Sequence, residues 1–241
     1  MRAPERRSAL PLVFDGVALD AGGAPRLRDV CCRLDAGPLS VMLGPNGAGK
    51  SLLLRLAAGL VAPSRGRVRW LGAPPARDAA AIVLQRPVLL RRSVRANLAY
   101  PLRLRGLSRS EVRQRSGRVL AAANLEALAE RPARRLSVGE QQRVALAQAW
   151  VREPEVLLLD EPAAALDPAA TYALEAAIGR LAREGVKVVM ATHDLAQARR
   201  MADEILFLHG GRLLEQTPAA EFFHSPRSAE AKRFLEGGVL T

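Results

Sequence analysis

The sequence is poor in cysteine and contains no long apolar run. Its two cysteines, Cys31 and Cys32, are adjacent, so they do not predict a structural disulfide with each other and instead favour a reducing compartment or ordinary packing. A membrane-spanning helix needs about 20 consecutive apolar residues, and no stretch approaches that length. Residues 1–8 are polar and no apolar segment follows them, so a signal sequence is not expected either.

Lysine and aromatic residues are also scarce. Lys50, Lys187 and Lys232 are the only lysines among 36 basic residues, and aromatic residues make up 4% of the 241. The net charge of +12 is typical of proteins that bind nucleic acids or anionic membranes. The arginines, however, are dispersed along the chain and do not form one stripe. This distribution favours a solvated surface and a coding bias toward arginine. With 49% hydrophobic residues, the chain can form one large domain or a domain with a subdomain.

Against this background a lysine inside a glycine-rich segment is informative. The segment comprises Gly44, Pro45, Asn46, Gly47, Ala48, Gly49, Lys50 and Ser51. It follows a strand-like run, residues 41–43, and precedes a helix-like run, residues 52–60, which is the context of a phosphate-binding loop. Its glycines let backbone N–H groups converge on phosphate oxygens at the helix N-terminus, Lys50 would reach the β and γ phosphates, and Ser51 would ligate Mg²⁺. The alternative is an ordinary glycine-rich turn.

The rest of the chain alternates between the two kinds of secondary structure. Strands are expected at residues 10–19, 27–34, 67–71, 81–84, 156–159, 187–192, 205–208 and 212–215, and helices at 108–130, 144–152, 167–184, 193–201, 218–224 and 227–236. An Arg- and Leu-rich helical region, residues 86–135, has expected breaks at Pro87, Pro101 and Gly106 and reads as an insertion. The pattern predicts a doubly wound α/β core that binds its ligand at the carboxyl ends of the strands.

Asp160 and Glu161 follow the apolar run at residues 156–159, which is typical of a strand buried on both faces of a parallel sheet. A carboxylate at this position can hold Mg²⁺, usually through water, opposite Ser51. Glu161, one residue later and facing elsewhere, can polarise an attacking water. Taken alone, the Asp-Glu pair is better explained as a polar strand end.

A third segment, Leu136-Ser137-Val138-Gly139-Glu140-Gln141-Gln142-Arg143, lies between these two. On its own it is a good helix start, because Ser137 and Glu140 have capping-box spacing. In this order it resembles the signature motif of ATP-binding cassette (ABC) proteins, usually LSGGQ followed by QQR. Gln85 resembles the Q-loop of that family, residues 164–167 its D-loop, and His193 its switch histidine. The resemblance covers nearly the whole chain.

The resemblance implies a fold and a set of domain boundaries. It implies a P-loop NTPase core, a mainly parallel sheet flanked by helices, with an N-terminal antiparallel β subdomain. Residues 1–241 would form a single nucleotide-binding domain. A helical subdomain, about residues 86–135, would interrupt a core made of residues 10–85 and 136–215, and residues 216–241 would form C-terminal helices.

It also implies roles for individual residues, with ATP and Mg²⁺ as cofactors. Residues 44–51 would cradle the phosphates, and Ser51, Asp160 and Gln85 would contact the magnesium. Glu161 would be the general base, His193 would contact the γ-phosphate, and Gln85 would relay to the partner. Ser137 and Gly139, with Asp167 of the D-loop, would act on ATP held by a second copy, so the resemblance implies a head-to-tail homodimer with two ATP molecules between the copies. Ser137 begins a helix, whose N-terminus attracts an anion.

Three residues depart from the family pattern. The aromatic that normally stacks on adenine is missing, because Ala21 falls about where it belongs and Phe14 comes too early. Val138 replaces a glycine and adds bulk near the phosphate of the ATP that a second copy would hold. Glu140 replaces a glutamine, which adds a charge and improves the cap. The expectation is a variant active cassette, with reduced activity as the alternative.

Three functions remain open. The first is the cytoplasmic ATPase subunit of a bacterial transporter, peripheral at the inner face of the membrane, with separate permease subunits and a substrate-binding protein as partners. Residues 85–98 resemble the same region of tungstate- and related oxyanion-importer ATPases, which favours an importer over an exporter or a non-transport process. The second, a DNA-repair or chromosome cassette, is disfavoured because the interval from Lys50 to Ser137 has no room for a long coiled coil, so no nucleic-acid partner is expected. The third is a binding protein whose nucleotide site acts only as a switch, against which Glu161 and His193 argue.

Overall fold

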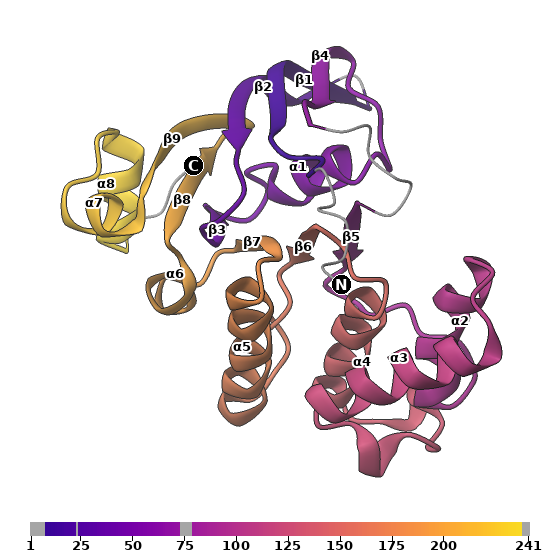
Figure 1. Cartoon of the computed structure of the whole chain (residues 1–241). Coiled ribbons are helices and arrows are strands. Elements are labelled where there is room, and N and C mark those ends of the chain that lie inside the picture. Colours follow the sequence, from indigo (N-terminus) through magenta and orange to yellow (C-terminus); the bar gives the residue numbers. More distant parts are fainter. Residues whose placement is uncertain (1–7, 23, 73–78, 238–241) are drawn as a thin grey trace.

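A computed structural model describes residues 8–22, 24–72 and 79–237 of the chain. Its centre is a sheet in which five neighbouring strands run parallel and an edge strand runs antiparallel (Figure 1). In spatial order the strands are β5 (Ala80–Val83), β6 (Val156–Asp160), β7 (Lys187–Thr192), β3 (Ser40–Leu43), β8 (Glu204–His209) and β9 (Arg212–Pro218). Every residue of β3, β6 and β7 is buried, which explains the apolar runs at residues 41–43, 156–159 and 188–191.

A smaller antiparallel sheet lies over one side of this core (Figure 1). Its strands are β1 (Leu12–Ala21), β2 (Ala24–Leu34) and β4 (Arg65–Trp70), in the order β2-β1-β4. Helix α1 (Lys50–Ala57) packs between the two sheets, because Leu53, Leu54 and Leu56 share one hydrophobic cluster with residues from both. Cys31 is exposed and Cys32 is buried in this region, and both are free thiols.

The opposite face of the central sheet is covered by other helices. These are α5 (Pro168–Arg183), α6 (Leu195–Met201), α7 (Ala219–His224) and α8 (Ala229–Leu235). Neighbouring residues of one strand serve the two faces in turn: Leu158 belongs to the cluster with α1, and Leu157 and Leu159 belong to the cluster with α5. The expected α/β class is therefore confirmed.

The helical region stands apart from the antiparallel sheet (Figure 1). It contains α2 (Val94–Leu104), α3 (Arg109–Ala122) and two short 3₁₀ turns, Glu126–Leu128 and Ala133–Arg135. Helix α4 (Val138–Trp150) joins it to the core: Val144 and Ala147 pack with α2 and α3, and Leu146 and Ala149 pack against the central sheet. No helix in the described ranges combines the length and the apolar character needed to span a bilayer.

Several predicted boundaries were wrong. Pro101 does not break the helical pattern but lies inside α2, whose fully buried Leu98 and Leu102 outweigh the backbone hydrogen bond that proline cannot donate. The helix expected at 108–130 ends at Ala122, because Asn124 adopts a left-handed conformation with φ of 53°. The N-terminal strands extend beyond the expected ranges 10–19 and 27–34, and Ala21 pairs with Ala24.

Helix boundaries near the phosphate loop and near the segment that resembles the signature motif also differ from the predicted ones. The helix expected at 52–60 begins earlier, at Lys50, and ends at Ala57, while the helix expected at 144–152 begins at Val138. Both shifts bring a helix N-terminus directly onto a motif. Most of the proline-rich connection expected after residue 71 lies outside the described residues.

Candidate functional site

The glycine-rich segment connects the end of β3 to the start of α1, and two of its glycines are required by close contacts. Gly44 has φ of 154°, and a Cβ atom there would lie 2.0 Å from the carbonyl oxygen of Leu208. Gly49 has φ of 103°, and its Cβ would lie 2.6 Å from Cδ2 of Leu27. The loop can pass between β8 and β2 only without these side chains.

The N-terminus of α1 is open. Its N-cap residue, Gly49, has no side chain that could accept a hydrogen bond from the first turn, and no acidic residue lies in that turn. Free backbone N–H groups at a helix N-terminus form a positive site for an anion. The loop and this first turn therefore offer a cradle for phosphate oxygens.

Lys50 adds a buried positive charge to the same cradle. Only 4% of the residue is exposed, and its Nζ donates hydrogen bonds to the carbonyl oxygens of Gly44 (2.7 Å) and Pro45 (2.9 Å). Burial lowers the pKa of Lys50, and the nearby carboxylates of Glu161, whose Oε1 is 3.8 Å from Nζ, and Asp160 oppose that shift. The ammonium group is thus fixed at the loop by the chain itself.

Ser51 and Asp160 meet although they are far apart in the sequence. The Ser51 hydroxyl donates to Oδ1 of Asp160 at 2.7 Å, and Asp160 is 4% exposed. A hydroxyl and a carboxylate are hard oxygen ligands of the kind Mg²⁺ uses together with water and substrate phosphates. The described residues contain no cluster of three or more acidic, histidine or cysteine side chains that could hold a metal without such help. The pair therefore fits a magnesium ion that arrives with a nucleotide.

Glu161 and His193 form a second pair at the carboxyl ends of neighbouring strands β6 and β7. Oε1 of Glu161 lies 3.2 Å from Nδ1 of His193. Glu161 has φ of 46°, an uncommon conformation for glutamate, and its backbone N–H donates to the carbonyl oxygen of Ala191 at 3.0 Å. Strained backbone of this kind persists where surrounding structure holds it, often at functional sites. Here it turns the Glu161 side chain toward the histidine.

These groups line one hollow of about 650 Å³. Gln85 lines it as well, so the predicted cis residues converge: the loop residues 46–51, Gln85, Glu161 and His193. Asp160 joins them through its bond to Ser51. The sheet explains the convergence, since β3, β6 and β7 are neighbours whose carboxyl ends share one edge.

Gly44 and Pro45, at the start of the phosphate loop, and Asp160 do not line this hollow themselves. Three further predicted residues do not line it either: Ser137, Gly139 and Asp167. Asp167 caps α5 by accepting a hydrogen bond from the Ala170 N–H at 2.8 Å. Gly139 lies against the same helix, where a Cβ would come within 2.9 Å of the Ala170 Cβ. Within one copy of the chain these residues support the start of α4 and α5.

The expected capping box at the start of α4 is present. Ser137 Oγ accepts from the Glu140 N–H at 3.3 Å, and Glu140 Oε2 accepts from the Ser137 N–H (2.8 Å) and hydroxyl (3.0 Å). The bond from the Ser137 backbone is the main reason that the pKa of Glu140 is lowered. Val138 is 54% exposed beside them. The polar groups of Ser137 are thus already engaged by Glu140.

Arg26 was not anticipated from the sequence, and it lines the hollow together with the phosphate loop. None of the residues that line this hollow in the described part of the chain is aromatic, and Phe14 is buried in the core with 1% exposed. The planar guanidinium of an arginine can stack on a nucleobase. The signal in the sequence is its position shortly after Ala21, near the place where the family resemblance puts the adenine-stacking side chain.

Comparison with known proteins extends these observations. The sequence model described as "ABC transporter" matches residues 27–164. The tungstate uptake system ATP-binding protein of Peptoclostridium acidaminophilum is 38% identical over 198 residues, which cover 80% of this chain and 92% of that protein. The sn-glycerol-3-phosphate import ATP-binding protein of Rhizobium johnstonii is 37% identical over 96% of this chain. This chain spans 63% of the length of that protein and 51% of the similar spermidine/putrescine import ATP-binding protein of Frankia alni.

Solved structures give the same answer for the fold. A structure of cbiO1 from Clostridium perfringens, described as part of the ABC transporter complex cbiONQ, superimposes with a TM-score of 0.81 at 29% identity. The alignment covers 89% of this chain and 90% of that one.

Proposed function

This chain belongs to the ABC transporter family, and we propose that it is the ATP-binding and ATP-hydrolysing subunit of a bacterial importer. The carrying observation is that one hollow brings together the phosphate loop with Lys50, the Ser51–Asp160 pair and the Glu161–His193 pair. This combination supplies a phosphate cradle, oxygen ligands for Mg²⁺ and a base beside one cavity.

In the proposed reaction the chain positions ATP and a water molecule. Amides of the loop and of the first turn of α1 bind the phosphates, and the Lys50 ammonium neutralises charge that develops on the leaving oxygens. Magnesium, held by Ser51 and Asp160, would supply further neutralisation of the phosphates. Glu161 accepts a proton from the water as the water oxygen bonds to the γ-phosphorus and the bond to the β-phosphate oxygen breaks, giving ADP and phosphate. His193 orients Glu161 through their contact.

We further propose that two copies pair head to tail, so that Ser137, Gly139 and Asp167 of one copy meet ATP on the other. The support is that these residues lie outside the hollow lined by the phosphate loop. Separate permease subunits and a substrate-binding protein are the proposed partners, with the chain peripheral at the cytoplasmic face of the membrane. We also propose the domain organisation: residues 1–241 form one nucleotide-binding domain, into which residues 86–135 are inserted.

The proposed cargo is tungstate or a related oxyanion. The support is the resemblance of residues 85–98 to oxyanion-importer ATPases, and the tungstate relative aligned over 92% of its length. Other similar proteins are named for phosphate, methionine and molybdenum import, so likeness to importers is broader than any one cargo. Uptake by the complete transporter, compared among tungstate, molybdate, phosphate and methionine, tests this choice, and a preference for methionine would refute it.

Glu161→Gln tests the reaction. The variant should bind Mg·ATP, lose hydrolysis by roughly 10²–10³-fold because the proton acceptor is gone, and accumulate as a dimer in size-exclusion chromatography. Glu184→Gln is the matched control, since Glu184 is exposed at the end of α5 and should leave all three readouts unchanged. Unaltered hydrolysis in Glu161→Gln would contradict the assigned base.

A further inference from the structure

A hollow of about 400 Å³ lies where α5 and α6 meet the Glu161–His193 pair, and we call it the α5–α6 hollow. Glu161 and His193 line both this hollow and the larger one beside the phosphate loop, which we call the nucleotide hollow. In the described part of the chain, the lining of the α5–α6 hollow contains no phosphate-loop residue but includes Gln197 and Arg200 of α6. Helix α6 is therefore placed to act on the pair without touching the nucleotide.

Glu175 joins α6 to α5. Only 6% of this residue is exposed, and it lies on α5 between Leu174 and Ile178, which pack that helix against the central sheet. Its carboxylate accepts hydrogen bonds from Nε of Arg200 at 3.0 Å, from Nη2 of Arg200 at 2.8 Å and from Nε2 of Gln197 at 3.2 Å. A two-pronged pair of arginine and carboxylate fixes direction as well as distance. One side chain of a firmly packed helix thus holds two side chains of α6.

The position of the His193 ring depends on where α6 begins. Helix α6 is short, Leu195–Met201, so its place is set by contacts with other segments rather than by its own stability. Asp194, the residue after His193, caps it by accepting from the N–H groups of Ala196 at 2.8 Å and Gln197 at 3.1 Å. The His193 side chain itself is 46% exposed, so close packing does not lock its ring. A shift of α6 would therefore move the histidine.

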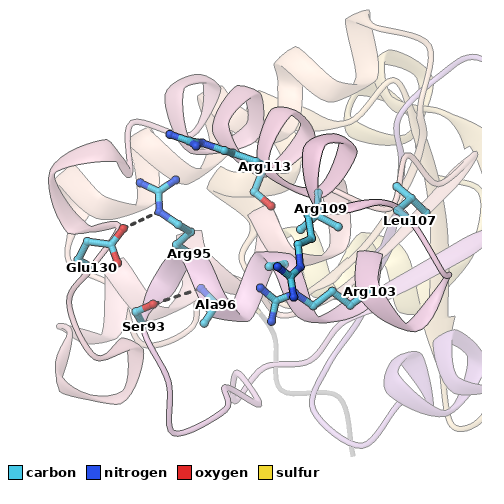
Figure 2. A pocket seen from close by; sticks show the side chains of 11 residues that line it. Ser93, Arg95, Ala96, Arg103, Leu107, Arg109, Arg113 and Glu130 are labelled. Atoms are coloured by element: carbon cyan, nitrogen blue, oxygen red, sulfur yellow. Dashed lines mark hydrogen bonds and ion pairs between the residues drawn. The ribbon is translucent and has the colours of Figure 1, made fainter.

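The burial of the Glu175 pair indicates what it contributes. Removing two charges from water offsets most of their attraction, so a buried ion pair adds little stability compared with apolar residues. It can instead enforce one register, because all three bonds to Glu175 form only when α6 has one placement on α5. Figure 2 shows a contrasting pair, Arg95 and Glu130, in which the Glu130 side chain is 73% exposed. Such a surface pair constrains its helices little.

We propose that Glu175 is a positioning residue for ATP hydrolysis: it clamps α6 to α5 and so keeps His193 in contact with Glu161. The inference rests on the proposed function, which gives His193 and Glu161 their roles. Glu175 does not line the nucleotide hollow, so it acts only through the histidine. Without the clamp the chain still binds ATP, but the base is misdirected and activates water less often.

Two variants of the whole chain separate positioning from stability. Glu175→Gln keeps the shape of the side chain and should lower kcat by at least about tenfold, because a small displacement of a catalytic group is costly. Its affinity for Mg·ATP should stay within about twofold of the parent. Glu175→Met/Arg200→Met replaces the pair by apolar side chains, so its thermal unfolding midpoint should not fall, yet it should lose as much kcat. A double variant as active as the parent would show that the pair serves stability alone.

The ring of His193 gives a readout that does not depend on turnover. The sequence contains three histidines, so their imidazole signals can be resolved by NMR, and His193→Gln identifies the signal of interest. In both Glu175 variants the His193 signal and its titration with pH should change. The signal of His209, which lies at the end of β8, should stay where it is.

The exposed pair in Figure 2 supplies matched controls. Glu130→Gln makes the same change of charge as Glu175→Gln, and Arg95→Met/Glu130→Met removes a whole Arg–Glu pair. Neither residue lines the nucleotide hollow or the α5–α6 hollow. Both control variants should keep the parental kcat and the parental His193 signal.

Parental kcat in the Glu175 variants, or an unchanged His193 signal, would overturn the proposal, and so would an equal loss of kcat in the controls. If the parent binds Mg·ATP but does not hydrolyse it, the proposed ATPase has failed instead. The His193 signal then still decides whether Glu175 positions the ring.

Discussion

Two helix N-termini contribute to the proposed nucleotide site, and they are built in opposite ways. Helix α1 begins after Gly49, which offers no side chain to its own first turn. Helix α4 begins after Ser137, whose N–H and hydroxyl both donate to Glu140. The first terminus is open to an external anion, whereas the second is closed by a carboxylate of its own chain.

The difference suggests an order of events. The α1 cradle is ready to bind phosphate in a single copy, with Lys50 already held at the loop. At α4, a γ-phosphate from a second copy would have to replace Glu140, which stays ionised because its pKa is lowered. Binding of ATP to the α1 cradle should therefore precede pairing, and pairing should be opposed by one negative charge at each ATP site.

Breaking the open terminus should have the broadest effect, because it should impair both ATP binding and hydrolysis. Lys50→Ala removes the buried ammonium and should lower hydrolysis by roughly 10²–10³-fold and weaken ATP binding in the isolated chain. Lys232→Ala, at an exposed position of α8, should change neither. Steady-state hydrolysis and equilibrium ATP titration measure the two effects. Retention of full ATP affinity would show that the loop binds phosphate without this charge.

Breaking the closed terminus should separate binding from hydrolysis. Ser137→Arg should leave ATP binding by the isolated chain intact and abolish hydrolysis, because the side chain acts only across the proposed dimer. The substitution also removes a helix cap, worth about 1 kcal/mol, so Ser108→Arg serves as control: it removes the equivalent capping box from α3, away from the nucleotide hollow. Equal loss of hydrolysis in both variants would mean that helix stability alone is responsible.

A smaller, opposite effect should follow from opening α4. Glu140→Gln removes the charge that faces the phosphate at each of the two ATP sites of the proposed dimer, and at about 1 kcal/mol for each charge pair in water this should raise the affinity of Mg·ATP-driven pairing roughly 30-fold. Glu111→Gln changes the matching residue of α3 and should leave pairing unchanged. Analytical ultracentrifugation with a hydrolysis-deficient background measures the shift. Weaker pairing in Glu140→Gln would show that the carboxylate helps the dimer.

The two termini should also differ in their response to acid. Since the pKa of Glu140 is lowered in the folded chain from its usual 4.5, its contribution to stability is present above that value and is lost as the pH falls through the lowered pKa. The first turn of α1 has no acidic residue and lacks this dependence. Hydrogen exchange of the α4 and α1 amides across this acidic range reports each helix, and Glu140→Gln should flatten the α4 profile.

The sequence was most informative where local chemistry decides the structure. The glycine spacing around Lys50, the buried run before Asp160, and the capping pair Ser137–Glu140 each specify a backbone arrangement that short-range rules predict. The expected membership of the ABC ATPases is confirmed by the matching family and relatives.

The rest depended on contacts between distant segments. The local sequence predicts a helix break at Pro101, because proline cannot donate a backbone hydrogen bond. The burial of Leu98 and Leu102 against other helices, which keeps α2 intact, is a long-range effect that the local sequence does not show. Arg26 joins the nucleotide hollow only because β2 passes beside the phosphate loop, as the close approach of Gly49 to Leu27 shows. The partner of Ser51, Asp160, was predictable from motif order, but their direct 2.7 Å bond was not.

Helix α4 is embedded at once in the helical region and in the core, through different faces of the same 13 residues. A continuous helix of this length resists bending, because bending breaks its ladder of backbone hydrogen bonds. Any rigid-body rotation of α2 and α3 must therefore carry Ser137 with it, or else shear the Leu146–Ala149 contacts with the sheet. A displacement of α2 and α3 would in this way change the position of Ser137, the residue that we propose completes the ATP site of a second copy.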